Sequence, residues 1–363
     1  MRRGKFVRWG VPIAAVVVVG AAIGTGPVIA AVSGDPALPE RTAAELLADA
    51  SAAVHNGGGP KPMSGTVLET ASLGLPALPS TGGGADASPL TMLSGSHEVK
   101  VWYGARDKIR LALPSQMSET NLIVNGEQAW YWNSDENTAT RVKFAPGADK
   151  QDQLPTPSAS DLTPQQAAEK ALAMVGEYTA VSVTNTDEVA GRPVYQIVLA
   201  PKDPGSLVQD VRIAVDGENY VPLRVQVFAK GSAEAAFEVK FTEVTFTPPA
   251  EENFAFTPPA GAKVVDKTIG AKDGADREER AKELTDAAKV VGEGWTSVAV
   301  LPMPKAEAKD GVDPIAEFLK TATPVEGGKV IRTKLLTALV TDDGRLLVGA
   351  VTPEVLQKAA QAK

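Results

Sequence analysis

Between residues 94 and 256 the chain alternates apolar and polar side chains in short segments, the pattern of β-strands with one buried face. Asn125-Gly126 separates two of these segments, as expected of a tight hairpin. Adjacent strands joined by tight turns pair antiparallel. The pattern predicts one large antiparallel sheet with a first strand at 65–70, followed by strands at 96–103, 108–113, 121–124, 128–132, 140–144, 178–185, 194–200, 211–215, 221–230 and 235–246.

The last of these strands changes its alternation near its end. Phe237, Val239 and Phe241 share one parity, whereas Val244 and Phe246 have the other. A single extra residue in a strand produces such a change, so we expect a β-bulge near Thr242-Glu243.

Helical periodicity predicts two helices beside this sheet, at 40–55 and 163–176. Thr42 and Glu45 form a capping box at the start of the first helix. Roughly ten strands at a spacing of 4.8 Å make a sheet nearly 50 Å wide, whereas a helix of about 13 residues spans about 20 Å. Two such helices cannot cover one full face, so the sheet should curl around an apolar hollow. We therefore expect an α+β fold, a curved antiparallel β half-barrel with helices on its concave face.

A change of character after residue 265 predicts a second, small α+β domain. The expected main domain spans residues 40–265, a linker and helix follow at 266–292, and the C-terminal domain spans 293–363. The helix that precedes the C-terminal domain is predicted at 277–291. Within the domain we expect a strand at 295–301, a helix at 313–319, a hairpin of strands 329–341 and 345–351 around Asp342-Asp343-Gly344, and a final helix that begins near Thr352.

Residues 71–94 interrupt the strand pattern with a stretch rich in Gly, Ser and Pro that also carries six large apolar residues. Two interpretations remain open. The segment is either a disordered insertion that touches the core in places, or a mobile flap over an apolar cavity.

The N-terminal 32 residues have the features of an export signal. Four basic residues precede an apolar stretch from Val11 to Ile23, and the small residues before Ala31 suit cleavage. The alternative is an uncleaved anchor that uses residues 11–32. In both cases the rest of the chain is expected outside the cytoplasm.

Composition excludes several classes of chemistry. The chain has no cysteine, and therefore no disulfide, thiolate zinc site, cysteine nucleophile or lipid-modified cysteine. The net charge is −8, and −12 without the first 30 residues, which argues against nucleic-acid binding. We expect a monomer without a cofactor.

Catalytic motifs are also missing from the sequence. The two histidines, His55 and His97, lack ligand spacing, and neither a Gly-x-Ser-x-Gly nor a Ser-x-x-Lys motif occurs. The paired acids lie in predicted turns, although sequence alone does not exclude two carboxylates facing across a cleft. The expectation is a protein that is not an enzyme.

Apolar residues on the predicted strands are the candidate ligand-binding residues. For the aromatic cluster around Trp130 and Trp132, cross-strand packing in the core and lining of a ligand cavity are both open. The full candidate set is Val101, Tyr103, Ile109, Leu111, Leu122, Val124, Trp130, Trp132, Ile197, Leu199, Ile213, Val225, Val227, Phe237, Val239 and Phe241.

Several segments resemble the LolA-like family of lipoprotein carriers. They are the Ala- and Leu-rich helix 42–54, the hairpin with Trp130-Tyr131-Trp132, the segments 195–199 and 221–225, and Phe254-Ala255-Phe256-Thr257-Pro258-Pro259. The resemblance covers residues 40–262 and implies a half-barrel that holds acyl chains. RseB and MucB, sigma-factor regulators of the same fold, add a smaller C-terminal domain. The composition is typical of an actinobacterial member.

Two functions follow from the pattern and the resemblance together. The first is an exported, non-enzymatic carrier or sensor that binds a lipid or the acyl chain of a lipoprotein. The alternative is an RseB/MucB-like regulator that binds the extracytoplasmic part of an anti-sigma factor.

Overall fold

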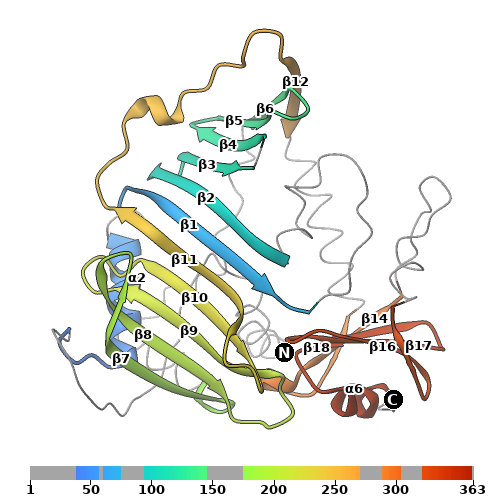
Figure 1. The fold of residues 1–363 in the computed structure, drawn as a ribbon. Helices are drawn as coiled ribbons and strands as arrows, with labels where there is room; N and C mark the ends of the chain where they lie inside the picture. Colours follow the sequence, from blue (N-terminus) through green and yellow to red (C-terminus); the bar gives the residue numbers. More distant parts are fainter. Residues whose placement is uncertain are drawn as a thin grey trace, which may run out of the picture.

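The computed structural model describes residues 38–56, 60–74, 94–115, 117–144, 175–269, 288–303 and 321–361. In these ranges the chain is mostly strand, in two sheets (Figure 1). The elements of the first part are α2 (Ala43–Asn56), β1 (Met63–Ser72), β2 (Ser94–Ala105), β3 (Lys108–Pro114), β4 (Glu119–Asn125), β5 (Gln128–Asn133), β6 (Thr138–Phe144), β7 (Thr179–Val189), β8 (Arg192–Pro201), β9 (Val208–Asp216), β10 (Pro222–Ala229), β11 (Ala235–Thr245), η4 (Glu251–Phe254) and β12 (Lys263–Ile269). Those of the second part are β13 (Lys289–Val291), η5 (Gly294–Thr296), β14 (Val298–Pro302), β15 (Thr323–Val325), β16 (Gly328–Arg332), β17 (Thr337–Thr341), β18 (Arg345–Gly349) and α6 (Pro353–Gln361).

The first sheet has twelve strands in the order β12-β6-β5-β4-β3-β2-β1-β11-β10-β9-β8-β7. All neighbours pair antiparallel except β12 and β6, which are parallel. The sheet is strongly curled, because Cα atoms of β7 and β11 approach within 8 Å although three strands separate them. In a flat sheet that separation is about 19 Å. The predicted α+β fold with a large curved, open antiparallel sheet is confirmed.

Helix α2 begins with the predicted capping box. The Thr42 backbone N–H donates to a Glu45 carboxylate oxygen at 2.7 Å, and the Glu45 N–H donates to Thr42 Oγ1 at 3.2 Å. The apolar side of the helix, with Ala43 and Leu46, packs in a core cluster with residues of β7 to β11. None of the helices within the described residues is long and apolar enough to cross a membrane.

The bulge predicted near Thr242-Glu243 is present in β11. Thr66 of β1 pairs with Glu243, and the next residue, Val67, pairs with Phe241, so Thr242 is the extra residue.

The hairpin between β4 and β5 is shifted by one position from the prediction. Asn125 pairs with Gln128, and the two turn residues are Gly126 and Glu127.

Three predictions about the later part of the chain were wrong. The single strand predicted at 329–341 is two strands, β16 and β17, separated by residues 333–336. Residues 289–291, the end of the predicted helix 277–291, form strand β13. Strand β12 and its parallel pairing lie in a segment for which the sequence predicted only a linker after residue 265. Residues 1–37, 75–93, most of the helix predicted at 163–176, and the helix predicted at 313–319 lie outside the described residues.

The second sheet has six strands in the order β13-β14-β18-β17-β16-β15, and α6 packs on its core through Leu356 and Ala359. It is fixed to the first sheet at two places. Near the loop between β8 and β9, the Leu207 N–H donates to the Ala350 carbonyl oxygen at 2.8 Å. At the end of β1, the Lys334 N–H donates to the Leu73 carbonyl oxygen at 2.7 Å. Trp295 is buried in the main core, with its indole N–H donating to Thr179 Oγ1 at 2.8 Å.

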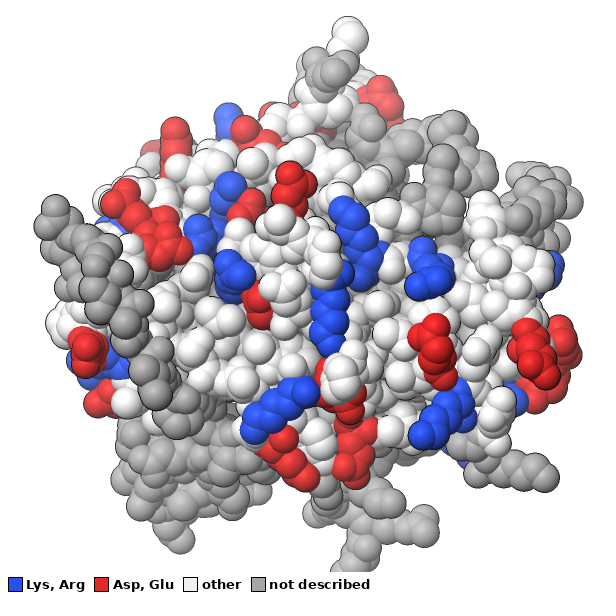
Figure 2. Space-filling model, turned by 60° about the horizontal axis from the view of Figure 1, so that its bottom comes forward, with Lys and Arg blue, Asp and Glu red and all other residues white. Residues whose placement is uncertain are grey.

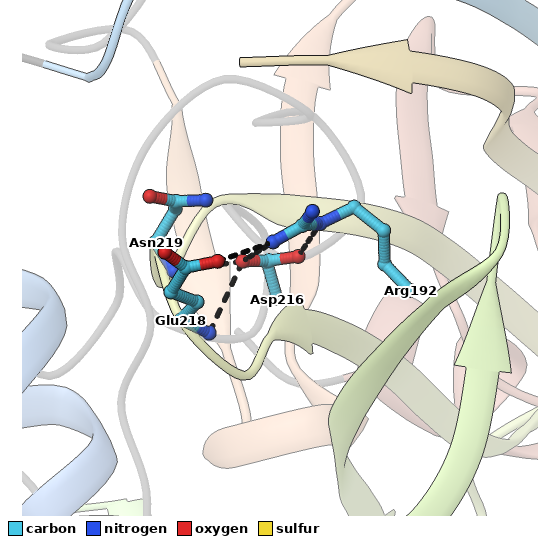
Figure 3. Close-up of polar contacts among 4 residues, drawn as sticks. All are labelled: Arg192, Asp216, Glu218 and Asn219. Carbon is cyan, nitrogen blue, oxygen red and sulfur yellow. Dashed lines mark hydrogen bonds and ion pairs between the residues drawn. The ribbon is translucent and has the colours of Figure 1, made fainter.

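The turn between β9 and β10 is held by the fully buried carboxylate of Asp216 (Figure 3). Arg192 of β8 donates to both of its oxygens, and the backbone N–H of Asn219 donates to Oδ1 at 2.7 Å. Burial alone raises the pKa of Asp216. The hydrogen bonds from Arg192 and from the N–H groups of Asn219 and Glu218 outweigh that effect and keep the pKa below its ordinary value.

We predict that Asp216→Ala lowers the free energy of unfolding by about 3 kcal/mol at neutral pH, because it leaves the partly buried Arg192 and two turn N–H groups without their acceptor. Since the folded pKa lies below the unfolded one, this stabilisation is present above a pH of about 4 and is lost as the pH falls further. Denaturant unfolding at several pH values measures it. Glu218→Ala, which removes an exposed partner of Arg192, should cost about 0.5 kcal/mol or less.

Candidate functional site

The pairing register assigns each strand residue to one of the two faces of the large sheet, because directly opposed residues of antiparallel strands point to the same side. Val67 of β1 opposes Val99 of β2 and Phe241 of β11. Continuing outward from β2, Val101 opposes Leu111, and Leu111 opposes Leu122. Continuing from β11, the ladder runs through Val239, Val225, Ile213 and Ile197. These residues define one face, which we call the apolar face.

Fourteen of the sixteen candidate residues lie together on the apolar face. Register pairs place them there across seven strands, β2 to β4 and β8 to β11, from two separate parts of the sequence. They are Val101, Tyr103, Ile109, Leu111, Leu122, Val124, Ile197, Leu199, Ile213, Val225, Val227, Phe237, Val239 and Phe241.

Trp130 and Trp132 lie on the opposite face. They oppose Ile123 and Asn121, whereas Tyr131 opposes Leu122 and so belongs to the apolar face. Both indoles pack against Phe256, with ring centroids 5.3 and 6.1 Å apart. Phe254, two residues earlier in the same segment after β11, is also buried. The two tryptophans therefore take part in packing between the sheet and this segment, apart from the other fourteen residues.

The protein itself covers one half of the apolar face. Over β7 to β11, Ile197, Leu199 and Val227 are buried in a cluster with Leu46 of α2 and Trp295 and Leu335 of the C-terminal part. Packing in the core accounts for these residues. The candidate site therefore narrows to the other half of the face.

The other half, over β2 to β5, is less covered. Val101, Tyr103, Ile109, Leu111 and Val124 are half-buried, and none of them belongs to a buried cluster of the described residues. Leu122 and its partner Tyr131 are 38% and 39% exposed. From β2 to β5 the described positions of this face carry no Lys, Arg, Asp or Glu. We call this region the open apolar half.

The electrostatics of the two faces differ. Burial of the Tyr103 phenol on the open apolar half raises its pKa. The opposite face carries polar ladders, in which Glu238 accepts hydrogen bonds from Gln226 at 2.7 Å and pairs with Lys240 at 2.8 Å. On the surface seen in Figure 2, Lys and Arg stand beside Asp and Glu over a mostly uncharged background, so no field of one sign gathers there.

Nothing in the described residues resembles a metal centre, because no group of three or more His, Asp or Glu side chains is arranged to hold an ion. The side chains of the candidate site can make apolar contacts with a bound molecule. The sequence alternation identified most of its members. It did not single out Tyr131, Val67, Val99 or Glu69, whose places on the apolar face follow from the pairing of β1 and β5 with their neighbours.

Comparisons with known proteins found similar structures and no similar sequences. No protein-family model matches the chain. No curated protein matches it either. Among solved structures, MucB in complex with periplasmic MucA is 14% identical, with a TM-score of 0.42, over 87% of this chain and 96% of that one. The Pseudomonas aeruginosa MucA/MucB complex is 14% identical, with a TM-score of 0.39, over 87% of this chain and 94% of that one.

A LolA superfamily protein from Nitrosomonas europaea is 9% identical, with a TM-score of 0.21, over 58% of this chain and 96% of that one. The solved structures to which this chain is similar thus include proteins whose names mention MucB and LolA.

Proposed function

We propose that this protein is an extracytoplasmic, non-enzymatic carrier or sensor that binds the aliphatic chain of a lipid or acylated lipoprotein on the open apolar half of its sheet. One observation carries the proposal. Large apolar side chains of the apolar face continue across β2 to β5, but the described core clusters cover this face only over β7 to β11.

Physical chemistry supports an aliphatic guest on this surface. An apolar face of a sheet is stabilised when helices, another sheet or a ligand remove it from water. Each square ångström of apolar area removed from water contributes about 25 cal/mol before the cost of ordering the ligand. Apart from His97 and Thr120, the half-buried side chains there are aliphatic or tyrosine, and they offer dispersion contacts without selecting an acyl chain by hydrogen bonds.

The extracytoplasmic location is part of the proposal and rests on the basic and apolar N-terminal residues of the sequence.

The alternative function is the binding of a protein segment in place of an aliphatic chain. A MucA segment is bound in two of the similar structures, and for this chain a bound peptide would be an outcome of the tests below.

The open half can be tested with two new charges. Leu122→Glu and Tyr131→Glu together should weaken binding of a fluorescent fatty-acyl probe at least tenfold, because two carboxylates would have to be desolvated under the chain. Both positions are more than a third exposed, so the free energy of unfolding should change little. Probe titration and thermal unfolding measure the two effects.

A matched control adds the same charge to the other side of the sheet. Gln128→Glu with Lys143→Gln changes an exposed pair on the opposite face of β5 and β6 by the same two units, and should leave probe affinity within twofold. Equal loss of affinity in both variants, or no probe binding by the wild type, would contradict the proposal. Co-purification of a peptide in place of lipid would favour the protein-segment alternative.

The tryptophans provide a separate test of the face assignment. Trp130→Phe should leave the affinity for the acyl probe within about twofold, because Trp130 packs on Phe256 on the opposite face. The same variant should lower the free energy of unfolding by about 1 kcal/mol through lost aromatic packing. A large loss of affinity with unchanged stability would place the binding site on the tryptophan face.

A further inference from the structure

One carboxylate interrupts the apolar face at its centre. Glu69 lies on β1 between Val67 and Ala71, and its register partners on the same face are His97 of β2 and Val239 of β11. The residue is 5% exposed. Neither carboxylate oxygen has a hydrogen-bond partner among the described residues.

This carboxylate is costly to the fold. A buried polar group is normally hydrogen-bonded, and a buried charge is normally paired. Asp216 meets that rule with Arg192 and two backbone N–H groups, whereas Glu69 does not. His97 lies directly across from Glu69, but its Nε2 donates to the Ser94 carbonyl oxygen at 3.0 Å. Burial raises the pKa of Glu69, an effect that His97 partly opposes.

The position of Glu69 relates it to the proposed site. Strand β1 adjoins β2, the first strand of the open apolar half, so Glu69 lies at the inner boundary of that half. Four strand-to-strand steps, about 19 Å, separate it from β5. An aliphatic chain that lies along Val99, Leu111 and Leu122 would therefore end beside the carboxylate oxygens of Glu69.

We infer that Glu69 is a polar anchor for the cationic amino group of an amino-bearing lipid whose aliphatic chain lies along the open apolar half. This inference rests on the proposed function and adds the class of head group to it. An ionised carboxylate can only accept hydrogen bonds, and an ammonium group offers three donors and the opposite charge. In a site of low polarity such a bond is stronger than in water, whereas an anionic head group would be repelled.

The experiment compares three ligands with the same twelve-carbon chain: dodecylamine, dodecanol and dodecanoate, each below its micelle-forming concentration. Isothermal titration of the full chain at pH 7 measures each affinity. The wild type should bind dodecylamine about tenfold more tightly than dodecanol, which corresponds to one charge-assisted hydrogen bond, and dodecanoate most weakly.

Two variants separate the anchor from the general charge of the protein. Glu69→Gln should reduce the preference for dodecylamine over dodecanol to about twofold while dodecanol binding persists. Glu98→Gln removes the same charge from an exposed position on the opposite face of β2, and should keep the tenfold preference. Glu69→Gln should also raise the Tm of the ligand-free protein by about 2–4 °C, because it removes a buried unpaired carboxylate.

The outcomes are distinguishable. If dodecanol binds but Glu69→Gln keeps the amine preference, the anchor is wrong and the proposed function stands. If none of the three ligands binds, the proposed function fails as well. A Tm that falls in Glu69→Gln would mean that the carboxylate serves the fold, which would also overturn the inference.

Discussion

The structure depends on one constraint: a sheet of twelve strands has an apolar face that must be kept from water. Strand alternation puts most large aliphatic side chains of β1 to β11 on that face and places polar ladders such as Gln226–Glu238–Lys240 on the other. Curling brings β7 close to β11 and shortens the span that has to be covered. Helix α2 and the C-terminal part then complete a core over β7 to β11.

The C-terminal part is integrated into this arrangement. Trp295 and Leu335 belong to the main core, and backbone hydrogen bonds join Leu207 to Ala350 and Lys334 to Leu73. These contacts hold the six-stranded sheet against both β1 and the β8–β9 loop. The C-terminal part therefore helps α2 to cover one half of the apolar face, whereas the half over β2 to β5 is only half-buried.

Two buried carboxylates show how differently the fold treats charge. Asp216 is surrounded by Arg192 and turn N–H groups, so its charge stabilises the hairpin ends (Figure 3). Glu69 lies between Val239 and His97 and has no hydrogen-bond partner among the described residues. The buried Glu69 carboxylate lowers the stability of the ligand-free fold. Binding of a ligand to it would offset that loss, which is why we infer that a ligand is its partner.

The sequence by itself determined the local elements. Period-two alternation predicted strands β1 to β11 of the large sheet, the Thr42–Glu45 capping box predicted the start of α2, and the change of parity after Phe241 predicted the bulge at Thr242. These follow from interactions within a few residues. The parity also sufficed to collect fourteen of the candidate residues on one face, because register between antiparallel neighbours preserves it.

Only the tertiary structure decided the rest. The parallel pairing of β12 with β6 joins segments more than 100 residues apart, and no local signal specifies it. The same holds for the side of the sheet on which Phe256 meets Trp130, and for the burial of Glu69 between β2 and β11. Which half of the apolar face is covered depends on where α2 and Trp295 dock, and docking is set by packing between distant parts of the chain.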